Sequence, residues 1–566
     1  MNMRLKQTFW AIVLATGVVG CNYLDTKIDT GVTQNQLEYD YSRVMRLGQT
    51  AYTYLNNGFT AIDNNIMAAV TDEAEQTASV SNAQMFNNGS WNAFNNPLDV
   101  YGNHYQAIRA ANFFLDYAGK DYKRLLALNR DTLNAGSTAY WKDVRSCEWL
   151  IAENHVLLAW YYFELIKRYG GVPLVEKTLD INGDLNLPRA KFDDIVTYIV
   201  AQIDNYKDGL QLNWKTTTDY VAQDGRLTKD AALALKSRIL LYAASPLYNE
   251  SNDLTKWEKA AAAAYDVIAS GIAQDKRYSL HPNYAQLFQE NNSVKSSEVI
   301  WSIRLRQDNA AISILMETNN YPIATPGGHS GVTPSQNLVS AYEYKGVPIP
   351  NDPYANRDPR LAASIVTNGS TWNARYIDIS KEGTDSHDKP NASRTGYYLK
   401  KFLVDGIDLL HPVAKYRSWI VFRYAEILLN FAEAMNEAYG PDDTHNYGMT
   451  ARDAINMVRN RTGVQMPQVD APDQTAMRAA IKHERRIELA FEDHRYWDLR
   501  RWKDGAELSK PLMGIRATKI GDGLYSYSDP FTVEERVFVT PKMYFFPIPD
   551  AEIRKSKGIL EQNPDW

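Results

Sequence analysis

The feature that most constrains the fold of this chain is a charged and aromatic stretch near its C-terminal end, residues 484–502. It contains no glycine or proline, so we expect it to form a continuous helix. Apolar and aromatic residues recur at three- and four-residue steps, which places them on one helix face: Ile487, Phe491, Leu499 and Trp502. Charged residues lie three or four positions apart on the other faces, where side chains are neighbours: Arg485 and Glu488, Glu488 and Glu492, Glu492 and Arg495.

This charged surface has two interpretations. In the structural one, paired charges join the helix to buried neighbours. In the catalytic one, Glu488 and Glu492 form an acid–base pair beside His494. The structural interpretation is favoured because two carboxylates one turn apart on a helix lie side by side, whereas carboxylates that hydrolyse a glycosidic bond flank it across about 5–9 Å.

The same stretch resembles the signature of the SusD/RagB family, the surface glycan-binding lipoproteins of Bacteroidetes nutrient-uptake systems. The family pattern is Glu-Arg-Arg-x-Glu-Leu-Ala-Phe-Glu followed by His-Arg-x-x-Asp-Leu-Arg-Arg-Trp, and it is complete here. Other runs resemble the family as well, so that the resemblance extends over nearly the whole chain: residues 161–174, 356–360, 545–549 and 563–566.

The resemblance implies a function. Members of the family capture oligosaccharides or polysaccharides at the cell surface and deliver them to a SusC-like TonB-dependent outer-membrane transporter, without catalysing a reaction. Two alternatives stay open. A glycoside hydrolase would need two carboxylates across a cleft, one of them with a raised pKa. A scaffold or peptide-binding member of the family would use its helices for protein contacts alone.

Helical spacing predicts a mainly α fold. We expect helices at residues 37–54, 100–117, 149–169, 192–206, 229–244, 255–270, 421–439 and 451–461. Thr228 and Thr450 are good N-caps, and Thr255 with Glu258 fits a capping box. A strict 34-residue repeat is absent, and it is the family resemblance that implies pairs of degenerate tetratricopeptide-like repeats.

Residues 273–417 differ in character from the rest. Glycine, proline, asparagine and serine become frequent there and helical periodicity fades, so we expect a loop-rich part. Long loops inside a folded chain are usually functional. We therefore predict that this part carries the ligand-contacting surface.

Candidate ligand-binding residues are aromatic or polar side chains in predicted loops, since tyrosine and tryptophan combine an apolar face with a polar edge and asparagine both donates and accepts hydrogen bonds. The asparagine-rich segment 82–96 contributes Trp91 and Asn92, although Trp91 could instead anchor the loop from beneath. The predicted ligand-binding residues are Asp72, Trp91, Asn92, Tyr321, Trp372, Arg375 and Tyr397, and Tyr376 and Tyr398 are further candidates in the loop-rich part.

Composition argues against several other kinds of partner. The formal net charge is −6 and no block of lysine and arginine occurs, so no nucleic-acid partner is expected. The chain has two cysteines, too few for a disulfide framework or a cysteine-based zinc site, and its nine histidines show no HExxH spacing. No cofactor and no metal ligand are predicted, although calcium, which binds common oxygen-bearing residues, stays open.

The N-terminal residues have the pattern of a targeting signal. Arg4 and Lys6 precede an apolar run at residues 9–19, which is too short to cross a membrane comfortably. Cys21 follows small residues as in a bacterial lipobox, the alternative being an ordinary signal peptide that happens to contain a cysteine. The resemblance implies that residues 1–20 are removed, that Cys21 is acylated, and that residues 21–566 form a single domain anchored to the outer membrane and facing the cell exterior.

Replacing Cys21 with Ala should move the protein from the membrane fraction to the soluble fraction, because acyl chains hold a protein on a membrane through about 0.8 kcal/mol per buried CH₂. Cell fractionation followed by immunoblotting measures this. Unchanged retention of the variant in membranes would show that Cys21 is not the anchor.

Overall fold

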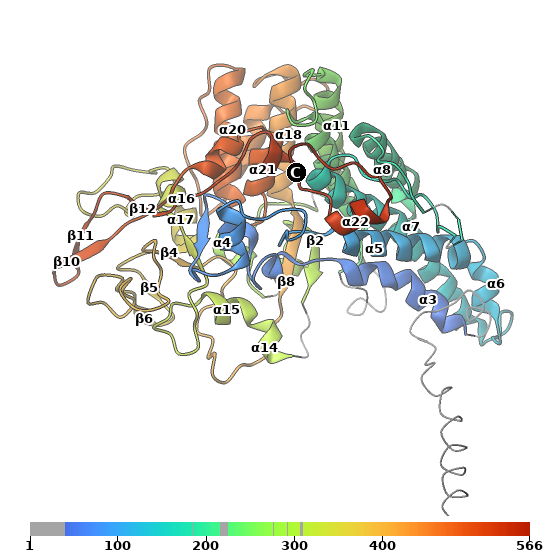
Figure 1. Ribbon diagram of the computed structural model, residues 1–566, viewed down its shortest axis with the longest axis horizontal. Helices are drawn as coiled ribbons and strands as arrows, with labels where there is room; N and C mark the ends of the chain where they lie inside the picture. Colours follow the sequence, from blue (N-terminus) through green and yellow to red (C-terminus); the bar gives the residue numbers. More distant parts are fainter. Residues whose placement is uncertain are drawn as a thin grey trace, which may run out of the picture.

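The computed structural model describes residues 40–566 apart from positions 181, 184, 215–222, 224, 276, 291 and 306–308. The predictions for Cys21 and for a signal peptide at residues 1–20 concern residues outside this described part. The longer helices gather on one side of the molecule, and loops with short strands and short helices occupy the other (Figure 1). A large hydrophobic core cluster includes residues from both sides.

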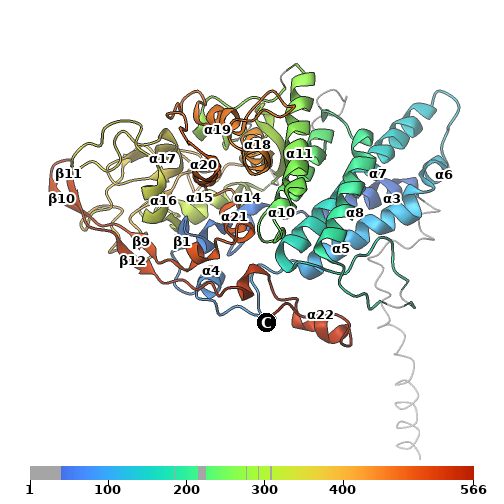
Figure 2. The same ribbon diagram turned by 90° about the horizontal axis from the view of Figure 1, so that it is seen from above.

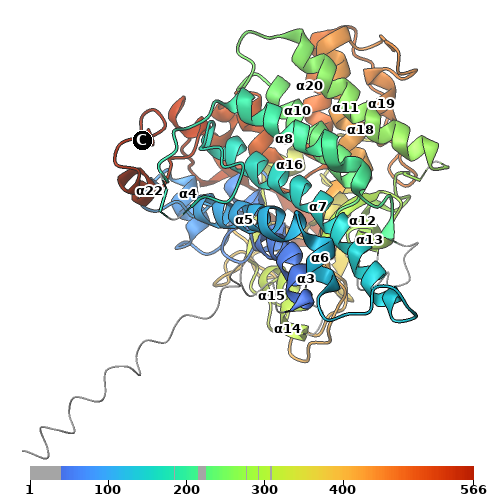
Figure 3. The same cartoon turned by 90° about the vertical axis from the view of Figure 1, so that its right-hand side faces the viewer.

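The helical part is built from successive helices that pack side by side (Figures 2 and 3). Helix α7 contacts α5 and α8, α10 contacts α11, and α18 contacts α11, α19 and α20. A mainly helical fold is therefore confirmed, while its relation to tetratricopeptide repeats stays a prediction. The longer helices are α3 (Tyr41–Thr50), α5 (Tyr101–Phe113), α7 (Ser137–Tyr169), α8 (Phe192–Tyr206), α10 (Lys229–Ala244), α11 (Leu254–Ala273), α18 (Tyr424–Tyr439), α19 (Ala451–Arg459) and α20 (Gln474–Glu488).

Helix ends follow local chemistry. The Thr228 hydroxyl accepts a hydrogen bond from the backbone of Ala231 at the start of α10, and Thr450 forms a capping box with Asp453 at the start of α19. The predicted capping box at Thr255 is wrong. Helix α11 begins earlier because Asp253 is its N-cap and accepts from the backbone of Thr255.

The loop-rich part has the predicted character. Between residues 274 and 417, no helix or strand among the described residues is longer than six residues. Two strand pairs tie this part to the rest of the chain: β1 (Ala74–Gln76) with β3 (Val332–Pro334), and β2 (Val299–Arg304) with β8 (Ser418–Arg423). Strand β8 takes the first residues of the segment predicted as helix 421–439, because Ile420, Val421 and Phe422 suit a buried strand.

Further short strands follow the signature stretch and were not foreseen. Strands β9 (Leu512–Gly514) and β12 (Phe531–Glu534) pair, as do β10 (Ala517–Gly521) and β11 (Leu524–Tyr527). The β10–β11 hairpin projects from the end of the molecule opposite α3 (Figures 1 and 2). A second hairpin of the loop-rich part, β5 (Thr371–Trp372) with β6 (Arg375–Tyr376), lies on the same side.

The signature stretch is not one continuous helix, which corrects the prediction. Helix α20 ends at Glu488 and α21 (Arg495–Arg501) begins after a turn in which Phe491 and Asp493 adopt positive φ of 67° and 62°. Tertiary contacts replace the missing helical hydrogen bonds: Phe491 N–H donates to Glu73, and the Lys401 ammonium donates to the carbonyl of Ala490. Helix propensity alone could not reveal these distant partners.

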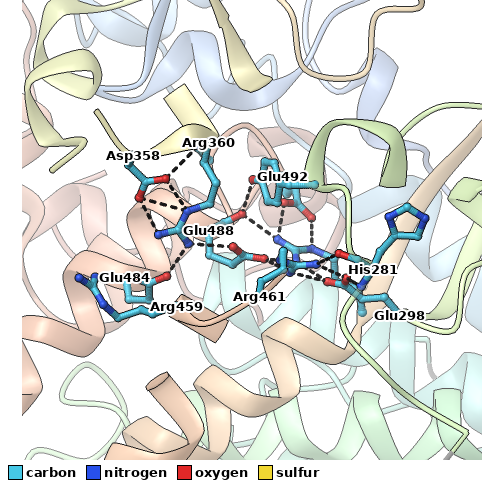
Figure 4. Close-up of polar contacts among 12 residues, drawn as sticks. His281, Glu298, Asp358, Arg360, Arg459, Arg461, Glu484, Glu488 and Glu492 are labelled. Atoms are coloured by element: carbon cyan, nitrogen blue, oxygen red, sulfur yellow. Dashed lines mark hydrogen bonds and ion pairs between the residues drawn. The ribbon is translucent and has the colours of Figure 1, made fainter. Parts of the chain in front are cut away.

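Most charges of the signature stretch are buried and pair with distant residues; the pair of Arg501 with Asp498 within α21 is an exception. Glu488 lies 2.7 Å from Arg423 at the end of β8 and 2.9 Å from Arg360 in α17 (Pro359–Ser364). We call the whole group the Arg–Glu cluster; it contains as many cations as carboxylates (Figure 4): Glu298, Asp358, Arg360, Lys401, Arg423, Arg459, Arg461, Glu484, Glu488 and Glu492.

The cluster joins segments that are far apart in sequence. Its members come from the loop before β2, from the start of α17, from the loop residue Lys401, from β8, from α19 and the residues after it, and from α20 and the turn that follows it. Side chains at 0–2% exposure, such as those of Arg360, Arg461 and Glu488, leave little room for water to replace a lost partner. The structural interpretation of the signature charges is therefore confirmed.

The variant Glu488→Gln should lower the free energy of unfolding by about 3–5 kcal/mol, because it leaves buried guanidiniums without their shared carboxylate. Burial alone would raise the pKa of Glu488, but Arg461, Arg423 and Arg360 lower it below its usual value. The stabilisation is thus present above the unfolded-state pKa of about 4.3 and is lost as the pH falls through the lower folded-state pKa.

Urea unfolding at neutral pH measures this change. Glu250→Gln is the matched control, since Glu250 pairs with Lys503 on the surface with 79% of its side chain exposed, and it should change the midpoint little. Equal effects of the two substitutions would contradict a structural role for the cluster.

Candidate ligand-binding surface

The catalytic alternative for the signature stretch does not match its geometry. Glu488 Oε1 lies 2.7 Å from Arg423 Nη1, and Glu492 Oε2 lies 2.7 Å from Nε of the same guanidinium. A lowered pKa makes Glu488 unsuited to donate a proton at neutral pH. Burial lowers the pKa of His494. Its Nε2 lies 4.0 Å from Glu426 and pairs with neither Glu488 nor Glu492.

The segment 82–96 is partly helical and its tryptophan is buried. Helix α4 (Asn82–Asn87) replaces the first half of the predicted loop. Trp91 is 2% exposed, and its ring lies 4.8 Å from Phe86 and 4.6 Å from Trp566 between ring centroids. Trp91 thus anchors the segment from beneath and offers no face to a ligand. Asn92 is exposed, but its side chain accepts from the backbone of Phe94 within a turn.

Asp72 belongs to the ion pairs of the signature stretch. Its two carboxylate oxygens lie 2.8 Å from Arg495 and 2.7 Å from Arg486. Burial would raise the pKa of Asp72, but these two guanidiniums lower it well below its usual value. Because both oxygens are engaged in a buried position, Asp72 ties β1 to the signature stretch and does not face a ligand.

The predicted residues of the loop-rich part mostly lie beneath its surface. Tyr321 and Trp372 are buried and their rings meet edge to face at 4.9 Å. Tyr397 is also buried. Arg375 is partly exposed, but its guanidinium binds both oxygens of Asp385 at 2.6 Å.

The structure does not bring the predicted residues together in one site. Asn92 lies beside the C-terminal segment, where Asp550 N–H donates to the carbonyl of Ala93. Arg375 lies on the β5–β6 hairpin, where it meets Asp385 and Thr325. The residues around Asn92 differ from those around Arg375, so the predicted ligand-binding residues lie on separate surfaces.

A different group of aromatic residues gathers where the two hairpins meet. We call it the tyrosine surface; it comprises Tyr354, Tyr376, Tyr397, Tyr525 and Tyr527. Its hydroxyls and rings interact: Tyr376 and Tyr525 hydroxyls lie 3.3 Å apart, and the rings of Tyr354 and Tyr527 meet edge to face at 5.5 Å. Tyr376 is 47% exposed, whereas Tyr397 is buried beneath Tyr354 and supports it from below.

The tyrosine surface offers both apolar rings and hydrogen-bonding groups. The Asn368 amide lies 3.4 Å from the Tyr527 hydroxyl. Asp352 is exposed in the same loop as Tyr354, and its Oδ1 accepts from the backbone of Tyr354 and Ala355. Burial raises the pKa of the Tyr527 phenol, so it stays protonated and able to donate at neutral pH. Such a surface suits a flat, hydroxylated ligand.

Sequence reasoning identified Tyr376 and Tyr397 but missed Tyr354, Tyr525 and Tyr527. The signal for the last two was present. Tyr525 and Tyr527 alternate along a strand and so share a face, and Gly521 to Gly523 mark a tight turn before them. Their position after the signature stretch, outside residues 273–417, kept them out of the predicted ligand region.

Two further searches of the described residues bear on the site. No group of three or more histidine, cysteine, aspartate or glutamate side chains in the described chain is arranged to hold a metal ion. None of the described helices combines the length and the apolar character that crossing a membrane requires.

Comparisons with known proteins agree on one family. A model described as the SusD family matches residues 297–566, and a model described as starch-binding associating with the outer membrane matches residues 22–241. SusD-like protein P38 of Formosa agariphila is 26% identical over 392 residues, which are 65% of this chain and 69% of that protein.

Solved structures show the same relationship. A SusD-like protein from Bacteroides fragilis superposes with a TM-score of 0.75 at 25% identity, over 94% of this chain and 99% of that one. A SusD-like carbohydrate binding protein from the same species has a TM-score of 0.72 at 23% identity, over 93% and 99% of the two chains. The resemblance read from the signature stretch is confirmed, and the chain belongs to the SusD/RagB family.

Proposed function

We propose that this chain captures oligosaccharides at the tyrosine surface and delivers them to a SusC-like TonB-dependent transporter in the outer membrane. The observation that carries the proposal is the meeting of two hairpins, β5–β6 and β10–β11, which gathers tyrosines on the loop-rich end. Family membership supports a glycan as cargo, since one matching model is described as starch-binding and one structural neighbour as carbohydrate binding.

The chemistry of the surface suits sugars. The C–H face of a sugar ring packs on an aromatic ring, and the hydroxyls at its edge exchange hydrogen bonds with phenol, amide and carboxylate groups. Tyr376 supplies an exposed ring, and Asn368 and Asp352 supply polar groups nearby. An open surface of this kind can bind one stretch of a long chain without enclosing its ends.

Binding without hydrolysis is the favoured activity. The acidic residues of the signature stretch, which were the strongest catalytic candidates, are engaged by guanidiniums in the Arg–Glu cluster. The proposal of a lipid anchor at Cys21 fits this role, because α3, the first described helix, lies at the end of the molecule opposite the β10–β11 hairpin (Figures 1 and 2). The tyrosine surface can then face away from the anchored end, toward the cell exterior.

Removing a ring from this surface should weaken glycan binding. We expect Tyr376→Ala and Tyr527→Ala each to raise the Kd for a bound oligosaccharide about tenfold, the loss typical of an aromatic anchor at a binding site. Calorimetric titration of the full chain against plant, microbial and host oligosaccharides measures this, and chromatography of the recovered sugar shows whether it stays intact.

Tyr41→Ala is the matched control, because Tyr41 is a partly exposed tyrosine on α3 that packs against Arg130, far from both hairpins. It should leave the affinity unchanged. Equal affinity of the Tyr376 and Tyr527 variants and the unaltered protein would overturn the assignment of the site. Cleavage of the sugar would favour the hydrolase, and binding of peptides alone would favour the peptide-binding alternative.

A further inference from the structure

A cavity of about 250 Å³ lies where the helical part meets the turn between α20 and α21. Its walls come from residues 56–61 and 97–100, from α5, α7 and α10, from β8, from the turn residues 492–494, and from Met67 and Trp497. It shares no lining residue with the tyrosine surface. The signature stretch thus contributes to a cavity wall as well as to the Arg–Glu cluster.

Polar atoms in this wall lack partners among the described residues. His104 on α5 is 2% exposed, and neither of its ring nitrogens makes a hydrogen bond there. The Nε of Arg168 and the Oδ1 of Asn57 are likewise buried and unpaired. A buried polar group without a hydrogen bond destabilises the fold, so a molecule that bonds to these atoms would be held in the cavity.

The unpaired atoms include hydrogen-bond donors and acceptors, so a ligand that pairs with all of them must carry both kinds of group. Burial lowers the pKa of His104 to about 3, so its ring is neutral and carries one donor and one acceptor. Arg168 Nε adds a donor and Asn57 Oδ1 adds an acceptor. A molecule rich in hydroxyl groups satisfies this mixture, because each hydroxyl both donates and accepts.

Most charged groups of the wall are engaged in ion pairs, some of them with residues outside the wall. Glu164 lies 2.6 Å from Lys167 and 2.6 Å from Arg168, whose cationic groups lie over the ring of Trp497. Arg238 pairs with Glu426 at 2.7 Å. Glu492 binds cations of the Arg–Glu cluster. The lining also includes Asp99, which accepts from the Tyr169 hydroxyl, and Asp493, whose pKa burial raises to about 7. The cations and carboxyl groups of the wall are therefore close to balance, which favours a neutral ligand.

The volume and the lining residues of the cavity also favour a small polar ligand. The volume lies just below the roughly 300 Å³ at which pockets for drug-sized ligands begin, and it exceeds the space of a single water of about 30 Å³ many times over. Trp160, Trp419 and Trp497 add aromatic surface to the polar wall. Asp493, which also lines the cavity, accepts from the backbone N–H of Met67.

We propose that this cavity binds a small neutral polyhydroxy molecule about the size of one sugar ring. The ligand would exchange hydrogen bonds with His104, Asn57 and Arg168 and rest against the tryptophan rings. Because it would contact α5, α7, β8 and the turn between α20 and α21 together, its binding would join the helical part to the signature stretch. The proposal does not require the tyrosine surface to bind glycan.

Saturation-transfer NMR on the full chain with D-glucose, D-galactose, D-mannose or N-acetyl-D-glucosamine tests the proposal. At least one of these sugars should bind, and His104→Phe should raise its Kd at least about tenfold, since it removes both ring nitrogens at similar volume. His155→Phe is the matched control. His155 lies on α7 outside the cavity, where its Nδ1 is 2.7 Å from the Gln202 side-chain oxygen, and its substitution should leave the Kd unchanged.

Arg168→Lys is a second variant, because it removes Nε and keeps the positive charge beside Glu164. It should also weaken binding, and thermal unfolding of each variant verifies that the protein is folded. Absence of saturation transfer for all four sugars would show that the cavity holds only water and would overturn the proposal. So would sugar binding that survives His104→Phe and Arg168→Lys but is lost in Tyr376→Ala, since it would then belong to the tyrosine surface.

Discussion

The buried Arg–Glu cluster is the interaction on which the rest of the fold depends. Glu488 at the end of α20 is shared by Arg360, Arg423 and Arg461, which come from three different segments. Buried charges are stable only when they are paired, so each segment has to reach the cluster in one position. The loop-rich part, which has few long elements of its own, is thereby fixed on the helical part.

This constraint separates the two roles of the chain. Residues of the signature stretch and Asp72 are engaged in ion pairs that hold segments together, and Trp91 is packed under its loop. The two hairpins at the other end expose the ring of Tyr376 and part of Tyr527. A protein organised in this way can change the residues of its hairpins, and with them its ligand, without disturbing the cluster that maintains the fold.

The elements that local sequence determines were predicted well. Helix α8 has the bounds predicted from helical periodicity. Helix α10 begins after its N-cap Thr228 and ends before Pro246, as predicted. Prediction failed where distant residues decide. The turn at Phe491 and Asp493 depends on Glu73, Met67 and Lys401. Trp91 looked like a surface ring because its partners Phe546 and Trp566 lie at the far end of the chain. The tyrosine surface likewise forms only when hairpins 149 residues apart meet.

The central claim is that the signature stretch maintains the fold while the hairpins bind the ligand. Hydrogen–deuterium exchange of the full chain with and without a bound oligosaccharide tests it most directly. The account predicts that the ligand slows amide exchange in β5–β6 and β10–β11 and leaves α20 and α21 unchanged. Protection by that oligosaccharide confined to α20 and α21, with none in the hairpins, would contradict it.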